Sequence, residues 1–242
     1  MITGAAGGIG QALVRTFCGA GYHVIGVDRE PVAAMPSAAE FLCCDLARTV
    51  GDAEEGERVL DLIRQRVGSH GLRALVNNAA VQILGGVDSL DRTQWAATLE
   101  VNLLAPFFWT QGLLPQLQAV QGSVINISSI HARLTKPDFV AYATSKAALS
   151  GLTRAMAVDL RGRVRVNAIE PAAIGTAMLK AGFAGQPERF ARLEGLHPLG
   201  RIGLPEEVAA CALELADGAS RFLHGACIAL DGGIGSCLLD PD

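Results

Sequence analysis

The sequence has no apolar run of the roughly 18 residues that a membrane-spanning helix needs. Its first residues also lack a basic region followed by a long apolar stretch, so we expect a cytoplasmic protein without a signal peptide. The net charge is -4 with no basic stripe, so nucleic acid is not an expected partner. The histidines are scattered and the six cysteines form no C-x-x-C pair. We therefore expect no metal site and free, mostly buried thiols.

Internal repeats and Pro/Gly/Ser-rich linkers are also missing, which predicts that residues 1–242 form one domain. Short apolar runs rich in Val and Ile alternate with helix-like stretches along the chain, as in strands buried on both faces of a parallel sheet. The runs are His23 to Val27, Phe41 to Cys44, Ala74 to Val76, Ser123 to Ile127, Val164 to Ile169 and Cys227 to Leu230. The alternation predicts an α/β fold with a doubly wound parallel sheet.

Two long helical patterns cover Leu99 to Val120 and Tyr142 to Leu160. Pro106 and Pro115 lie inside the first, where they predict a kink or break, because proline removes a backbone donor and its ring clashes with the preceding turn.

A glycine-rich turn, Thr3-Gly4-Ala5-Ala6-Gly7-Gly8-Ile9-Gly10, precedes a helix-like stretch. A glycine-rich turn on its own can be present only because the backbone bends tightly there, without binding a ligand. A lone Asp after a strand is ordinarily a turn residue. Here Asp28 follows an apolar run, 18 residues after Gly10. A carboxylate at about this spacing can bind the adenosine ribose, while the turn binds the pyrophosphate at the helix N-terminus. The combination favours a Rossmann-type dinucleotide site, with candidate contacts at Gly4, Gly8, Ile9, Gly10 and Asp28.

Tyr142 and Lys146 are four residues apart on an expected helix, so they share one face. The chain has only two tyrosines and three lysines, and composition alone would place a Lys four residues after a Tyr with a chance of roughly 2%. A neighbouring ammonium favours the phenolate, which suits a tyrosine that transfers protons. The pair therefore indicates acid–base catalysis.

Ser128 and Ser129 end a strand run, where the ligand crevice of a parallel sheet lies. A hydroxyl there can donate to a carbonyl oxygen that becomes alkoxide-like during hydride transfer. Two serines after a strand are also ordinary turn residues.

Together these motifs resemble the short-chain dehydrogenase/reductase family over almost the whole chain. Thr3 to Gly10 resembles its T-G-x-x-x-G-x-G turn, and Asn77-Asn78-Ala79-Ala80 its N-N-A-G segment. Tyr142-Ala143-Thr144-Ser145-Lys146 matches Y-x-x-x-K, Ser129 lies 13 residues before Tyr142, and Asp231-Gly232-Gly233 is a typical tail.

The resemblance implies a role for each matching residue. It implies an acid/base at Tyr142, a lysine at Lys146 that lowers the tyrosine pKa and binds the nicotinamide ribose, and a serine at Ser129 that polarises the substrate oxygen. It also implies an asparagine at Asn102 that supports a water linking Lys146 to solvent. The further cofactor contacts that it implies are Asp45 near adenine, Asn78 beside the cofactor and Thr176 at the carboxamide.

Two residues depart from the family pattern, Ala80 and Ala172, where the family has glycine. An added methyl at each is expected to narrow the nicotinamide and substrate region. The resemblance also implies a substrate lid at residues 178–199, which equally suits an ordinary surface helix. His131 and Arg133 could meet a polar or anionic substrate group, or face solvent or another subunit.

The sequence thus predicts an oxidoreductase that moves a hydride between NAD and a secondary alcohol or ketone. NAD is favoured over NADP because Asp28 would repel a 2′-phosphate, although Arg29 beside it could bind one. An NADPH-dependent 3-ketoacyl-type reductase and a non-catalytic dinucleotide-binding regulator are the alternatives. We expect a homotetramer, and a first strand that either is very short or begins upstream of Met1.

Overall fold

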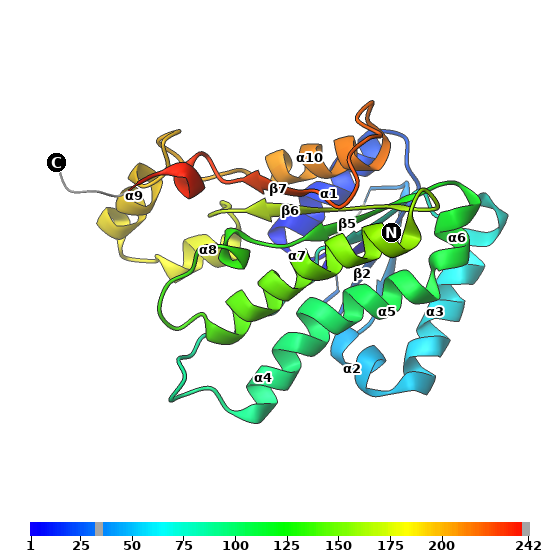
Figure 1. The fold of residues 1–242 in the computed structure, drawn as a ribbon, viewed down its shortest axis with the longest axis horizontal. Helices are drawn as coiled ribbons and strands as arrows, with labels where there is room; N and C mark the ends of the chain where they lie inside the picture. The colour runs from blue at the N-terminus through cyan, green and yellow to red at the C-terminus, as the bar shows by residue number, and fades with distance from the viewer. Residues whose placement is uncertain (32–35, 239–242) are drawn as a thin grey trace.

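Seven strands form one parallel sheet in the computed structural model, in the order β3-β2-β1-β4-β5-β6-β7 (Figure 1). The structure describes residues 1–31 and 36–238. The strands are β1 (Ile2–Thr3), β2 (Val24–Asp28), β3 (Ala39–Cys43), β4 (Ala74–Asn77), β5 (Ser123–Ile127), β6 (Arg165–Pro171) and β7 (Cys227–Leu230). The strand order reverses between β1 and β4, which confirms the predicted doubly wound, Rossmann-type fold.

The first strand is very short, which is one of the two alternatives that the sequence predicted. Ile2 pairs with Gly26 of β2 and with Val76 of β4. The α-amino group of Met1 donates to the carbonyl of Ala74 at 2.8 Å, and burial lowers the pKa of this amine to about 5. These contacts join β1 to both of its neighbours in the sheet.

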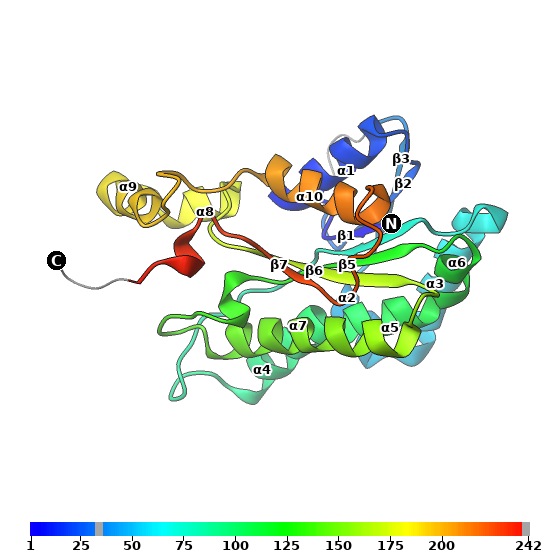
Figure 2. The same cartoon turned by 45° about the horizontal axis from the view of Figure 1, so that its top comes forward.

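Helices cover both faces of the sheet (Figure 2). They are α1 (Gly8–Gly19), α2 (Leu46–Gly51), α3 (Ala53–Val67), α4 (Arg92–Leu99), α5 (Ala105–Gly112), α6 (Leu114–Ala119), α7 (Val140–Leu160), α8 (Ala177–Gly182), α9 (Pro187–Gly195) and α10 (Pro205–Asp217). α1 and α10 lie on one face, and α4, α5 and α7 lie on the other. Within the described residues no helix is long and apolar enough to cross a membrane.

Successive residues of each central strand enter different cores. Leu75 packs in the core that holds Trp109 of α5, whereas Val76 packs in the core that holds Leu13 of α1 and Leu215 of α10. Because side chains alternate across a strand, a strand covered on both faces must be apolar at every position. This explains why the strand runs lack polar alternation.

The first long helix is interrupted where proline predicts it. A π-helical segment, η2 (Glu100–Leu104), joins α4 to α5, and Leu113 separates α5 from α6 before Pro115. Pro106 has no N–H, so the carbonyl of Asn102, four residues earlier, lacks its α-helical donor. The break is confirmed. Its π geometry was not predicted, because it depends on the bond from the Ala105 amide to the Glu100 carbonyl.

Arginines close the helix ends at the edge where the strands begin. Arg73 donates to the Val120 carbonyl after α6 at 3.0 Å, and Arg165 donates to the Ala216 carbonyl of α10 at 3.0 Å. A cation at a helix C-terminus satisfies free carbonyls and matches the helix dipole. The opposite edge, where the strands end, is the edge at which open α/β sheets bind their ligands.

The six cysteines are free thiols, as expected. Only Cys44 among them is buried, so the expectation that most are buried is wrong. Cys43 is exposed because it ends the edge strand β3, and Cys237 is exposed beyond the last strand. In the part of the chain that the structure describes, no three His, Cys, Asp or Glu side chains gather as they would around a metal ion.

Candidate active site

The glycine-rich turn lies between β1 and α1, at the edge where the strands end. Gly4 has φ +66°, and a Cβ there would come within 2.8 Å of the Ala79 Cα. A Cβ on Gly10 would lie 1.9 Å from the Gly4 carbonyl oxygen. The residue before α1 is Gly7, which has no capping side chain, so the first N–H groups of the helix are free. The turn therefore fits the phosphates of a dinucleotide.

Asp28 lies beside this turn. One carboxylate oxygen accepts from the Ala6 amide at 2.9 Å, and the other accepts from the Glu30 amide at 3.2 Å. Arg29 is exposed, and its guanidinium lies 3.8 Å from the Glu30 carboxylate. A fixed, negatively charged carboxylate therefore ends β2 next to the phosphate turn.

Asp45 and Asn78 lie just after β3 and β4, which have two strands between them in the sheet, but each already has a structural partner. Asp45 caps α2, where its carboxylate accepts from the Ala47 amide at 3.0 Å. The Asn78 side chain donates to the carbonyls of Thr3 and Gly4, at 3.0 and 3.1 Å. Asn78 thus holds the glycine turn in place, and a direct contact with a cofactor stays a prediction.

Thr176 brings the loop after β6 to the glycine turn. A Cβ on Gly8 would lie 2.9 Å from the Thr176 Cγ2. The Thr176 hydroxyl caps α8 by accepting from the Leu179 amide at 3.2 Å. Ile9 packs its side chain against the core beneath the turn, so only its backbone is placed for a phosphate.

Ser129 and Tyr142 are the predicted reactive pair. Ser129 begins a 3-10 turn, η3 (Ile130–Ala132), and its hydroxyl accepts from the His131 amide at 3.1 Å. Burial raises the pKa of Tyr142, and a hydrogen bond with Ser129 lowers it by a smaller amount. The structure thus places the predicted serine against the predicted tyrosine.

Lys146 lies one turn after Tyr142 on α7, with its Nζ 5.7 Å from the tyrosine ring centroid. The ammonium donates to the Ile127 carbonyl at 2.8 Å. Burial lowers the pKa of Lys146 to about 7. The expected lowering of the Tyr142 pKa is therefore not produced by the protein groups alone, because burial disfavours charge on both side chains.

The Asn102 side chain is fully used by the fold. Its oxygen accepts from the Val81 amide at 2.8 Å, and its nitrogen donates to the Val81 carbonyl at 2.9 Å and to the Ser145 hydroxyl at 3.0 Å. These bonds join η2 to the segment after β4 and to α7. Pro106 cannot donate to the Asn102 backbone carbonyl, and the binding of a water at Asn102 stays a prediction.

His131 and Arg133 pack against protein groups. The His131 ring stacks on Phe139, with centroids 4.4 Å apart, and meets the Tyr142 ring edge-on at 5.7 Å. Arg133 Nε donates to the buried carboxylate of Glu170 at 2.7 Å. Glu170 was not among the predicted site residues, although an acidic residue directly after the apolar run Val164 to Ile169 was a signal for it.

α8 and α9 extend past the end of the sheet, in the segment proposed as a lid (Figure 1). Phe183 and Phe190 join the two helices through an edge-on ring contact, with centroids 5.6 Å apart. The buried His197 donates from Nδ1 to the Leu193 carbonyl at 2.9 Å, because a carbonyl can only accept. His197 thus fastens the last turn of α9 to the body of the protein.

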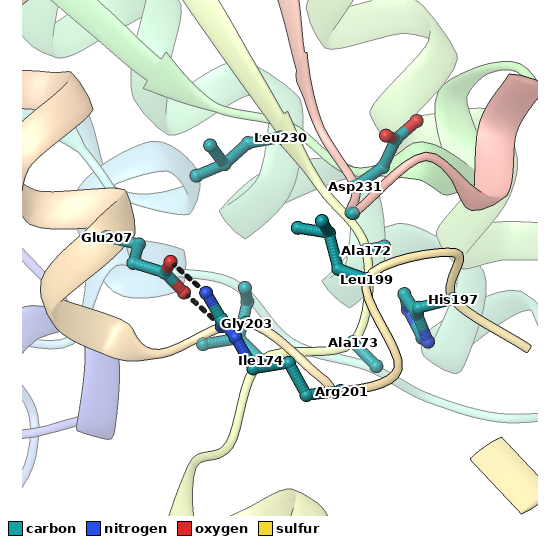
Figure 3. Close-up of a pocket in the computed structure, with 11 residues that line it drawn as sticks. Ala172, Ala173, Ile174, His197, Leu199, Arg201, Gly203, Glu207, Leu230 and Asp231 are labelled. Carbon is teal, nitrogen blue, oxygen red and sulfur yellow. Dashed lines mark hydrogen bonds and ion pairs between the residues drawn. The ribbon is translucent and has the colours of Figure 1, made fainter. Parts of the chain in front are cut away.

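A cavity of about 70 Å³ lies behind the loop that follows β6 (Figure 3). The Arg201–Glu207 ion pair lies on one side of it, and Asp231 and His197 lie on the other. Ala172, which replaces the family glycine, lines this cavity. Ala80, the other departure, is exposed.

Comparisons with known proteins agree with this geometry. Residues 4–235 match the family profile described as Enoyl-(Acyl carrier protein) reductase. Protein FixR of Bradyrhizobium diazoefficiens is 36% identical, over 96% of this chain and 85% of its own length. Galactitol 2-dehydrogenase (L-tagatose-forming) of Cereibacter sphaeroides is 33% identical, over 96% of this chain and 92% of its own.

A solved structure shares the fold throughout. The ligand-free aldohexose dehydrogenase of Thermoplasma acidophilum superposes with a TM-score of 0.92 at 27% identity, covering 100% of this chain and 95% of that one. With the glycine turn, the Ser129–Tyr142 pair and Lys146 in their places, the chain belongs to the short-chain dehydrogenase/reductase family of nicotinamide-dependent oxidoreductases.

Proposed function

We propose that this protein is an NAD-dependent dehydrogenase that interconverts a secondary alcohol and its ketone. The observation that carries the proposal is that the Ser129 hydroxyl lowers the pKa of the buried Tyr142, with the buried Lys146 one helical turn after the tyrosine. When bound, the nicotinamide supplies the hydride acceptor or donor. The protein's own task is then to bind the carbinol oxygen and to move its proton.

Tyr142 takes the proton of the alcohol in oxidation and returns it in reduction. Ser129 donates to the same oxygen, which stabilises the charge that develops there. Lys146, held by Ile127, binds the nicotinamide ribose and passes protons toward the Asn102 carbonyl and solvent. A binder without catalysis has no need of these proton-transfer groups, which disfavours the regulator alternative.

Asp28 favours NAD over NADP. Its carboxylate is fixed at the end of β2, where a 2′-phosphate would meet it at close range. Arg29, the one residue that argued for NADP, has the Glu30 carboxylate 3.8 Å away, which offsets part of its charge. The two carboxylates therefore outweigh the single exposed guanidinium.

The substrate class that the relatives favour is a neutral polyhydroxy compound. Galactitol 2-dehydrogenase and aldohexose dehydrogenase are named for such substrates. The description of the matching family profile favours a second candidate, an NADPH-dependent reductase of carrier-bound acyl groups. Cofactor use separates the two, because the second candidate requires that NADP be accepted beside Asp28.

We also propose a homotetramer located in the cytoplasm. Leu104, Phe107 and Phe108 lie on η2 and α5 with 38–42% of their surface exposed, whereas Trp109 is buried in the core. Phe107 and Phe108 also contact each other, with ring centroids 5.4 Å apart. Neighbouring exposed apolar side chains on a helix face favour contact with a second copy of the chain.

The test is a screen of polyols, sugars and simple secondary alcohols with both oxidised cofactors, and of ketones with both reduced ones. Absorbance of the reduced nicotinamide reports turnover. The proposal predicts oxidation of a neutral polyol or sugar with NAD. Turnover confined to acyl thioesters with NADPH would support the second candidate, and cofactor binding without turnover on any substrate would support the regulator.

A further inference from the structure

Glu170 is a buried carboxylate at the end of β6 that the proposed chemistry does not use. Its side chain is 2% exposed. Oε2 accepts from Arg133 Nε at 2.7 Å, and Oε1 accepts from the Ser150 hydroxyl at 2.8 Å. Each oxygen therefore has one protein donor, and the two donors come from different parts of the fold.

Both donors lead to the catalytic residues. Arg133 ends the segment 128–133, here named the serine turn, which contains Ser129. On the other side, the Ser150 hydroxyl lies 3.0 Å from the Ser128 hydroxyl. Ser150 gives its one proton to Glu170, so it accepts from Ser128, whose own proton is shared between Ser150 and the Lys146 carbonyl at 3.0 Å. Glu170 thus connects to the last residue of the serine turn directly and to the first through Ser150.

Backbone pairing adds a third connection. The Ser128 amide donates to the carbonyl of Ile169, the residue before Glu170, at 2.8 Å. A shift of Glu170 along β6 would therefore move both ends of the serine turn. Ser129 would move with it, relative to Tyr142 and Lys146, which lie together on α7.

Stability alone does not explain this arrangement. The ion pair gains little over apolar residues of the same volume, because Glu170 loses its hydration, and Arg133 is 47% exposed, so water screens its charge. Arg133 also has the Asp231 carboxylate 3.9 Å away, so one guanidinium lies between two carboxylates from β6 and the end of β7. The two carboxylates fix the orientation of the Arg133 side chain, and this in turn fixes the end of the serine turn.

We infer that Glu170 is a positioning residue of the active site, which holds Ser129 at the correct place relative to Tyr142 and Lys146 through Arg133, Ser150 and Ser128. The inference rests on the proposed function, because it assigns the reaction to Ser129 and Tyr142. It adds that the charge of Glu170 is part of the catalytic apparatus although the residue touches neither substrate nor cofactor.

The test compares Glu170→Gln with a control from the same strand, Asn167→Ser. Glutamine fills the same space without charge, so the serine turn loses its fixed end. Asn167 is also fully buried and bonds to Leu223 and Ala226, away from the serine turn. The Asn167→Ser variant therefore measures how much kcat changes when β6 loses a buried polar group and the protein is only destabilised.

We expect Glu170→Gln to lower kcat by about tenfold or more, because a misplaced reacting group costs up to about 10², with KM for NAD changed less than about twofold. Glu170→Asp, which keeps the charge, should recover part of the loss. The double variant Glu170→Gln/Arg133→Met should lose no more than the single one, since the two residues act as a pair. Asn167→Ser should keep kcat while its melting temperature falls.

Hydrogen exchange of the backbone amides in residues 128–133 supplies a readout that needs no substrate. We expect exchange there to be faster by about tenfold in Glu170→Gln and unchanged in Asn167→Ser. Unchanged exchange in Glu170→Gln, or equal changes in both variants, would overturn the inference. If the wild-type protein oxidised no alcohol, the proposed function would fail, and the exchange experiment would still decide the role of Glu170.

Discussion

Lys146 and Ile127 are joined by a hydrogen bond of 2.8 Å between the lysine ammonium and the backbone carbonyl of the residue that ends β5. Ser129 follows Ile127 by two residues, so one strand end positions both a catalytic hydroxyl and the only fully buried lysine. This bond orients the ammonium, but it does not compensate for the hydration that the charge loses. The site therefore holds Lys146 at a cost in stability.

That cost predicts a pH-dependent difference between the wild-type protein and Lys146→Met. Burial lowers the pKa of Lys146 from 10.5 to about 7. Between these values only the unfolded chain binds the proton, so the wild-type free energy of unfolding falls by about 1.4 kcal/mol for each unit of decreasing pH on account of this group. Lys146→Met has no group that takes up this proton on unfolding. Its free energy of unfolding relative to wild type should therefore grow as pH falls from 10.5 to about 7.

Urea unfolding of both proteins across that window measures the difference. The variant leaves the Ile127 carbonyl without its donor, which costs about 1–3 kcal/mol at every pH and does not change the slope. Turnover should be lost at all pH values. A stability difference that stays constant from neutral to alkaline pH would show that Lys146 keeps its proton in the folded protein.

Asp28→Asn should change the cofactor preference. The variant keeps the volume of the side chain and removes the charge that would face a 2′-phosphate. We expect the ratio of kcat/KM for NAD over NADP to fall by about tenfold or more, which corresponds to about 1.4 kcal/mol of removed repulsion. Glu40→Gln, which removes an exposed carboxylate from β3, is the matched control and should leave the ratio unchanged. A wild-type preference for NADP would contradict the assigned role of Asp28.

Light scattering should give a molar mass that is a multiple of the 25.2 kDa chain. Replacing Phe107 and Phe108 together by serine should shift it toward the single chain, because both rings lie exposed on one helix. Val87→Ser removes an apolar side chain that is exposed elsewhere, in the segment between β4 and α4. It should leave the mass unchanged. A wild-type mass near that of one chain would rule out the proposed assembly.

Strand positions were predictable because burial on both faces makes each strand an apolar run. Two of the six predicted runs, at β5 and β7, match the observed bounds, and β1 was expected to be short. The glycine turn, Asp28, and the Tyr142–Lys146 pair were predictable because local spacing fixes their neighbours. Ser129 was placed by the family spacing.

What the sequence could not predict depends on contacts between distant segments. The partners of the Asn102 side chain are set by how η2 packs on α7. The pKa of Tyr142 depends on burial, which its neighbours in the sequence do not report. Glu170 was visible as an acidic residue directly after an apolar run, but its meaning required Arg133 and Ser150, which reach it from a turn and from a helix.

The most direct test follows deuterium as it is transferred as deuteride from the carbinol carbon of a secondary alcohol to the nicotinamide, first in the wild-type protein and then in Tyr142→Phe. Mass spectrometry of the reduced cofactor, with galactitol or the best alcohol of the screen, detects the transfer. The account predicts deuterated NADH from the wild-type protein. For the variant it predicts a rate lower by about 10²–10⁴, with NADH affinity nearly unchanged, because only the proton-transferring hydroxyl is lost. Transfer by Tyr142→Phe at the wild-type rate would contradict the role of Tyr142, and the absence of transfer by a wild-type protein that binds NADH would contradict the proposed reaction.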